Sequence, residues 1–156
     1  MRLGATEDGF SSVEWALGLG LIILPLVIAV TSVAPVLDRL STARTVAAET
    51  ARTMALADNW ADGEERAFDV ARLVAGNHGI DDAEWCSGGP VDGCVSVEIT
   101  GTTPGVLGRG EEVYVVVRIP TAAVTVPFIG EFASFMLQGA HTERVDDYRS
   151  FPPVAP

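Results

Sequence analysis

The sequence predicts an α+β protein, in which a long N-terminal transmembrane α-helix continues into a small extracytoplasmic domain. Three observations indicate this fold class. The 23 residues of 15–37 carry no charge. Apolar residues then recur at helical spacing, and later segments alternate apolar with polar residues, as half-buried strands do. We expect the domain to hold a second helix and an antiparallel sheet of three to four strands.

The composition of the chain limits its function. Its 156 residues suffice for one small domain plus an anchor. The formal net charge is −11, and the ten basic residues are arginines that form no cluster. Phosphate neutralisation dominates nucleic-acid affinity, so no nucleic-acid partner is expected. The sequence has no phosphate-binding loop, nucleophile elbow or zinc-protease motif, and we therefore expect neither an enzyme nor a cofactor.

The apolar run 15–37 is long enough to cross a membrane. As a helix it spans about 34 Å, against a hydrocarbon core of about 30 Å. A buried helix of a soluble protein and a cleaved signal peptide are the alternatives. A signal peptide has a positive leader and an apolar stretch of about 7–15 residues. Here Arg2 stands against Glu7 and Asp8, and the run is longer, so we predict a transmembrane helix over residues 10–37.

A short polar leader, MRLGATEDG, precedes the run and ends in Gly9. Phe10 follows, and Glu14 is the fifth residue counted from Phe10. The residues Val-Glu-Trp-Ala surround this glutamate, Pro25 lies early in the run, and the stretch LSTARTVAAETARTMA comes later. The glycine–phenylalanine–glutamate spacing resembles the class III signal of type IV pilins. The whole stretch, about residues 8–57, resembles the TadE/TadG-like pseudopilins of tight-adherence (Flp-type) pilus systems, although its leader has only one basic residue.

The resemblance implies a minor pilin that is processed and then assembled into a pilus. A prepilin peptidase would cut between Gly9 and Phe10 and remove the leader 1–9, and a glycine at the cut lets the backbone extend freely. The new amine of Phe10 would then lie one helical turn from the Glu14 carboxylate, within reach of pairing in one subunit or between subunits. Other pilin subunits, the pilus assembly machinery and membrane lipid are the implied partners.

Two alternatives stand beside this interpretation. Glu14 can act as a helix-start residue, because an acid in the first turn interacts favourably with the helix dipole, by about 0.3–1 kcal/mol. The whole chain can also be an uncleaved single-pass anchor that carries an extracytoplasmic binding domain. The state of the N-terminus in the mature protein distinguishes this second alternative from a pilin.

Two features are expected along the first helix. Pro25 removes one backbone donor and frees the carbonyl of Leu21, which predicts a bend; a local weak point for filament packing is the alternative. Beyond the membrane the helix should continue to about Leu56, because one stripe of mostly small residues recurs at spacings of three and four. The stripe consists of Val36, Leu40, Ala43, Ala47, Thr50, Met54 and Ala57. It suits packing either on the chain's own domain or on sister helices.

A second helix is predicted over residues 62–79. Asp62 can cap its start, with Glu65 three residues later, and the segment 76–79 can close it with glycine. The expected apolar face consists of Ala67, Phe68, Ala71, Val74 and Ala75.

Strands are predicted next within the domain, which we place at residues 38–150. Residues 94–100 alternate as a half-buried strand, and residues 113–119 form a more buried one. Pro120 should end the latter, so that residues 123–126 form at best an edge strand. The expected core face of the sheet, backed by the second helix through Phe68 and Val74, consists of Val95, Val97, Ile99, Val113, Val115 and Val117.

The last part of the chain gives weaker patterns. Residues 129–140 are expected to form a short helical turn and residues 141–148 a final strand. The tail 151–156, which is rich in proline, is expected to be disordered.

Cys86 and Cys94 are the only cysteines, and they flank a turn-rich loop. Such a pair predicts a disulfide and an oxidising, extracytoplasmic compartment. The alternative is a metal site, for which the nearby candidates are His78, Asp81, Asp82 and Glu84. Their spacing matches no known ligand pattern, and a solvated loop without metal is favoured.

The orientation of the chain in the membrane is where two arguments disagree. Arg2 lies alone before the membrane segment, whereas Arg39, Arg44 and Arg52 follow it. The positive-inside rule would therefore place the domain in the cytoplasm. The cysteine pair and the pilin-like signal favour the opposite orientation, which we adopt: a single-pass protein of the cytoplasmic membrane with its domain outside, released to the cell surface only within an assembled pilus.

Overall fold

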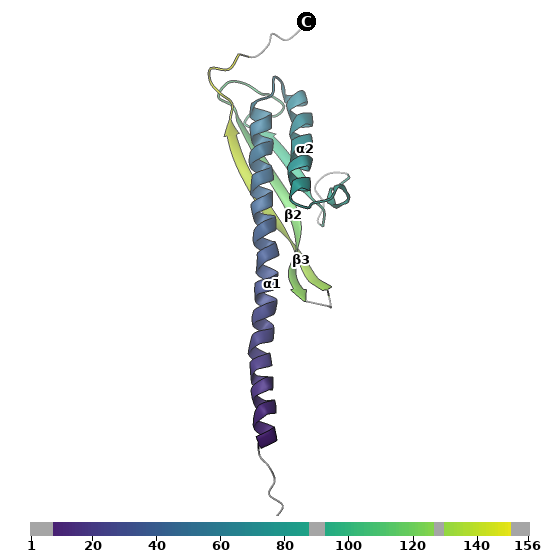
Figure 1. The fold of residues 1–156 in the computed structure, drawn as a ribbon. Coiled ribbons are helices and arrows are strands. Elements are labelled where there is room, and N and C mark those ends of the chain that lie inside the picture. The colour runs from purple at the N-terminus through teal and green to yellow at the C-terminus, as the bar shows by residue number, and fades with distance from the viewer. Residues whose placement is uncertain (1–7, 88–92, 127–129, 151–156) are drawn as a thin grey trace, which may run out of the picture.

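One long helix organises the molecule. The computed structural model describes residues 8–87, 93–126 and 130–150. Helix α1, Asp8–Ala55, is 48 residues long and runs through both halves of the molecule, and the rest of the fold packs beside its C-terminal half (Figure 1). Pro25 and Pro35 lie inside α1 without ending it. The bend predicted at Pro25 stays a prediction, and residues 1–7 and 151–156 lie outside the described residues.

The C-terminal half of α1 forms the centre of the core. We call Thr42–Ala55 the core segment. Its buried side chains are mostly small and recur at helical spacing: Thr42, Ala43, Val46, Ala47, Thr50, Ala51, Met54 and Ala55. The predicted stripe is therefore confirmed, and its packing partner is the chain's own domain.

The C-terminal end of α1 is held by a residue from far along the chain. The last carbonyls of a helix lack partners within it. The Arg149 guanidinium donates hydrogen bonds to the carbonyls of Ala55 and Leu56, and it lies 3.3 Å from the Asp58 carboxylate. One side chain thus satisfies two carbonyls and joins the end of the described chain to the end of α1.

Helix α2, Trp60–Asn77, packs antiparallel to α1. Its N-cap is Asn59, whose Oδ1 accepts the Asp62 backbone N–H at 3.0 Å. The prediction of Asp62 as the cap was wrong by one turn, because Asn59 occupies the cap and Asp62 is its partner. Gly63 lets α2 approach α1 closely, since an added Cβ would lie 2.9 Å from the Met54 sulfur. Ala67, Ala71 and Ala75 are buried as predicted, whereas Phe68 and Val74 are half-buried.

A three-stranded antiparallel sheet completes the α+β fold. The strands are β1, Ser96–Gly101, β2, Glu112–Val126, and β3, Gly130–Arg144, in the order β1-β2-β3. The predicted fold class is thereby confirmed. A short 3₁₀ turn, η1, Asp82–Glu84, lies between α2 and β1.

The long β2–β3 hairpin corrects two predictions. Strand β2 continues through Pro120, which pairs with Met136, instead of ending there. Residues 130–144 form a single strand, so the helical turn predicted at 129–140 was wrong, and the predicted final strand at 141–148 holds only to Arg144. Val145 extends this pairing by one step, because its N–H donates to the Glu111 carbonyl at 2.9 Å.

The sheet presents its core face mainly to α1. Val95, Val113, Val115 and Val117 are buried as predicted, and Val97 and Ile99 pack on them half-buried. The expected backing by α2 was wrong in its main element, because the core segment of α1 covers β2 and β3 (Figure 1). Gly139 shows how closely they meet: a Cβ added there would overlap the backbone of Ala43.

Candidate functional site

The predicted processing and pairing residues lie at the beginning of α1. Gly9 and Phe10 belong to its first described turn, and Glu14 follows one turn later. Glu14 is exposed, and no described residue forms an ion pair or hydrogen bond with it. The cleavage after Gly9 and the pairing of Glu14 with a Phe10 amine both stay predictions.

The next part of α1 has no protein neighbour. Every residue of Val13–Val27, which we call the bare segment, is exposed. The most apolar window of the helix has a mean hydropathy of 2.5, and none of it is buried. Leu21 is 78% exposed and Trp15 is 72% exposed. Length and composition together make the bare segment a candidate for contact with lipid or with other apolar helices.

An ion pair lies just after the end of the apolar run, where α1 enters the domain. Arg39 Nη1 lies 3.2 Å from Glu84 Oε2, and both side chains are about one-third exposed. The other oxygen of Glu84 accepts the Asp81 N–H at 3.0 Å. Arg39 therefore attaches the segment after α2 to α1. Sequence analysis missed this pair because the two residues are 45 positions apart with no local pattern between them.

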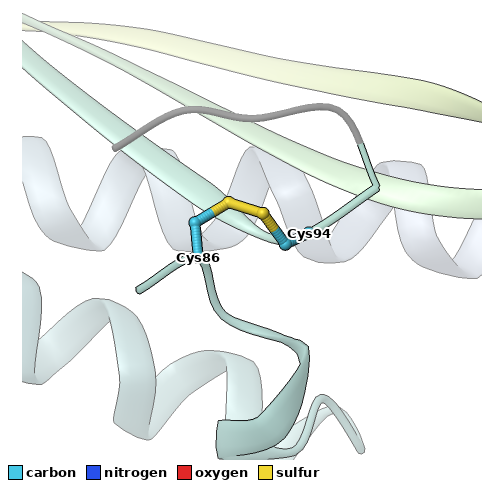
Figure 2. The surroundings of a disulfide bond; sticks show 2 residues. All are labelled: Cys86 and Cys94. Atoms are coloured by element: carbon cyan, nitrogen blue, oxygen red, sulfur yellow. A yellow bond between two sulfur atoms is a disulfide. The ribbon is translucent and has the colours of Figure 1, made fainter. Parts of the chain in front are cut away.

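The predicted disulfide between Cys86 and Cys94 is confirmed, and Figure 2 shows it at the neck of the intervening loop. Two backbone hydrogen bonds lie next to it. The Cys86 N–H donates to the Val95 carbonyl at 3.0 Å, and the Val95 N–H donates to the Glu84 carbonyl at 2.7 Å. The bond thus fixes η1 against the start of β1.

An open groove lies between α2 and β1. Its volume is about 430 Å³, and it is lined by residues of α2, the disulfide region and β1. The Arg72 guanidinium lies 5.7 Å from the centre of the Trp85 ring, a cation–π distance. Trp85 Nε1 and Ser96 Oγ are buried, and no described residue bonds to either atom. Sequence analysis missed this groove, since its parts come from three separate segments.

The residues considered for a metal site do not gather. In the described part of the chain, no group of three His, Cys, Asp or Glu side chains is placed to hold an ion. Glu84 is already bound to Arg39 and to the Asp81 N–H. His78 and Asp82 are exposed at the surface.

Comparison with protein-family models, with curated proteins and with solved structures gives no match. A long N-terminal apolar helix, which includes the bare segment, passes into a small α+β domain that carries a disulfide. This is a pilin-like architecture. The apolar helix indicates membrane anchoring or secretion, and the disulfide indicates an extracytoplasmic domain.

Proposed function

We propose that the chain is a minor pilin or pseudopilin of a type IV pilus of the tight-adherence (Flp) kind. Its role is structural and not enzymatic. The observation that carries the proposal is the division of α1, whose bare segment is apolar on all sides from Trp15 onward while its core segment holds the domain. One continuous helix can thus be stored in a membrane and later packed against sister helices in a filament. The Gly9–Phe10–Glu14 spacing supports the same role.

The proposed orientation places the domain outside the cytoplasmic membrane. The disulfide supports it, because such bonds persist in oxidising compartments. The arginines after the membrane segment argue against it. Arg39 is weaker evidence for a cytoplasmic domain than its position suggests, because it is paired with Glu84 and belongs to the fold of the domain.

Alkylation of thiols without prior reduction tests the compartment. We expect protein from native envelopes to contain no free thiol at Cys86 or Cys94. Two alkylated cysteines would contradict the outward orientation.

Glu14 provides the test of assembly. In the proposed filament, its carboxylate offsets the positive Phe10 amine inside an apolar helix bundle, where an unpaired charge is costly. The variant Glu14→Gln keeps the size of the side chain but removes its charge. We expect normal membrane insertion and normal cleavage after Gly9, with a strong loss of the protein from sheared surface fractions.

Gly9→Leu is the matched variant, since it should remain full length in the membrane. N-terminal mass analysis reads cleavage, and immunodetection in sheared fractions reads assembly. Cleaved Glu14→Gln protein that enters filaments at the normal level would remove the charge-pairing role. A native protein that keeps Met1 would remove the pilin proposal itself.

A second candidate function is an uncleaved, membrane-anchored binding domain. The groove between α2 and β1 favours it, because two buried polar atoms, Trp85 Nε1 and Ser96 Oγ, lie in its lining residues without a partner among the described residues. Binding domains keep such polar groups to orient a ligand. An intact N-terminus together with loss of an extracytoplasmic ligand on Trp85→Phe would favour this function.

A further inference from the structure

The bare segment of α1 is too short to cross a bilayer alone. From Trp15 to Val27 the helix measures about 20 Å, whereas the hydrocarbon core is about 30 Å thick. Extending the span toward the N-terminus would bring the charge of Glu14 into the hydrocarbon, at about 2.5–3.5 kcal/mol or more. The shortfall therefore falls on the other side, next to Val27, where α1 is no longer bare.

Beyond Val27 one face of α1 is partly covered, and the β2–β3 hairpin is the part of the fold that packs along this helix together with α2. Ile28, Ser32 and Val36 are half-buried, and they recur every four residues along a single face. Val30 and Val33, on other faces, stay exposed. Figure 1 shows the loop end of the hairpin beside this part of α1, well below α2.

The length of the hairpin agrees with this placement. Gly139 contacts α1 at Ala43, and β3 extends from there to Gly130, about 30 Å of strand. The helix from Ala43 back to Ile28 measures about 22 Å. A strand that crosses α1 at a moderate angle thus reaches the level of Ile28 with its loop end.

Charge is distributed unevenly along the hairpin. Its distal end, away from the loop, carries Glu112, Arg118, Glu143 and Arg144. Between Arg118 and His141 the only ionisable residue is Glu131. The half of the hairpin nearer the loop is therefore nearly as poor in charge as the apolar run of α1. Among its described side chains, Phe135 is 40% exposed, and Ala122 and Met136 are half-buried.

We propose that the membrane-proximal half of the hairpin, residues 119–126 and 130–138, rests in the headgroup layer of the outer leaflet. This inference relies on the proposed membrane residence of α1. Open strand edges do not enter hydrocarbon, so the hairpin stops at the headgroups. Local thinning of the bilayer accommodates the short span. The domain then has two membrane contacts, and the second fixes its rotation about α1.

Two matched positions on β3 test the contact. Ser134 and Thr142 are both exposed and lie on the same face of the strand, one in each half of the hairpin. Ser134→Cys and Thr142→Cys each accept an environment-sensitive fluorophore, since the native cysteines are joined in a disulfide. The full-length protein is inserted into phosphatidylcholine vesicles, and only the floated fraction is measured.

We expect spin-labelled lipid with its nitroxide near the headgroup to quench the fluorophore at Ser134 and not the one at Thr142. Aqueous iodide should quench Thr142 severalfold more strongly than Ser134. Equal iodide quenching at both positions would overturn the inference. A fluorophore at position 134 that is protected from iodide but not quenched by the spin-labelled lipid would also overturn the inference. In that case another copy of the chain, and not lipid, would cover this position. Protein that does not float with the vesicles would instead refute membrane residence, and this inference with it.

Discussion

The two halves of α1 use apolar residues in opposite ways. The bare segment carries large side chains, mostly Leu, Ile and Val, and exposes them. The core segment carries Ala and Thr at most of its buried positions and hides them completely; Ala47 is 0% exposed. In a water-soluble helix the large apolar residues face the core, because burial stabilises by about 25 cal/mol per Å².

This difference indicates which surroundings suit each of the two segments. The small residues of the core segment let the sheet approach the helix backbone, as Gly139 against Ala43 shows. The large residues of the bare segment have no such neighbour, and a continuous apolar surface of this size does not persist in water. One helix is thus divided between a protein interior and a non-aqueous environment.

The largest expected loss of stability comes from placing a charge on the core face of the sheet, against which the core segment packs. Val115 is 0% exposed on the core face of β2. An unpaired buried carboxylate costs several kcal/mol, a large part of a typical domain stability of about 5–15 kcal/mol. Val115→Asp should therefore abolish cooperative thermal unfolding, measured by circular dichroism of the full-length protein in detergent. Val106→Asp, at an exposed position, is the control, and an unchanged Val115→Asp transition would refute the core assignment.

Truncation of one large side chain in each half compares the two directly. Met54 is fully buried in the core segment, whereas Leu21 is exposed in the bare segment. Met54→Ala should destabilise the domain by about 2–5 kcal/mol, because it leaves a cavity. Leu21→Ala should leave denaturant unfolding of the domain in detergent unchanged. Equal losses would mean that the bare segment also packs within the monomer.

The close approach of α1 to β3 predicts a smaller effect. Gly139→Ala should cost about 1–3 kcal/mol, since the backbone of Ala43 occupies the space of a new Cβ. Gly76→Ala is the matched control, because apart from the backbone of α2 itself nothing lies within 4 Å of its Cβ position. It should be neutral or stabilise α2 by up to about 1 kcal/mol. A shift in thermal midpoint that is the same for both variants would contradict the close contact.

The smallest effect is expected at the boundary between the two halves. Arg39→Gln removes the partly exposed ion pair with Glu84, which should cost less than about 1 kcal/mol. Arg44→Gln is the control, as Arg44 has no ion pair among the described residues. High salt should lower the free energy of unfolding of the wild type toward that of Arg39→Gln, and it should leave the value of the variant unchanged. A salt-independent difference between the two proteins would show that Arg39 acts through packing.

Local patterns were enough to predict the helices and the disulfide. The stripe from Val36 to Ala57 marks the core segment because helix packing follows spacings of three and four. Cys86 and Cys94 are close in sequence, so their bond needs little information from the rest of the fold. The apolar run 15–37 could also be recognised from its length and lack of charge, but the sequence did not show that residues beyond Val27 are partly covered.

The hairpin could not be predicted, because its causes are distant contacts. Residues 130–140 include good helix formers such as Ala, Met, Leu and Gln, but pairing with β2 overrides their propensity. Pro120 is tolerated because it lies two residues beyond Arg118, the last β2 residue before it that is paired with β1. Its missing N–H faces the side of β2 where no strand continues, as at an edge strand. Neither fact is visible in a short stretch of sequence.

The Arg149 contacts at the end of α1 set an order of events during synthesis. The bare segment is made early and can enter a membrane at once. The carbonyl of Ala55 gains its hydrogen bond only when Arg149, 94 positions later, has been made. Until β2 and β3 have been made, the core segment can pack only against α2, and its contacts with the sheet, which are of long range, form late. Synthesis of Arg149 is therefore the event that completes the domain, and a chain arrested before it leaves the carbonyls of Ala55 and Leu56 without this partner.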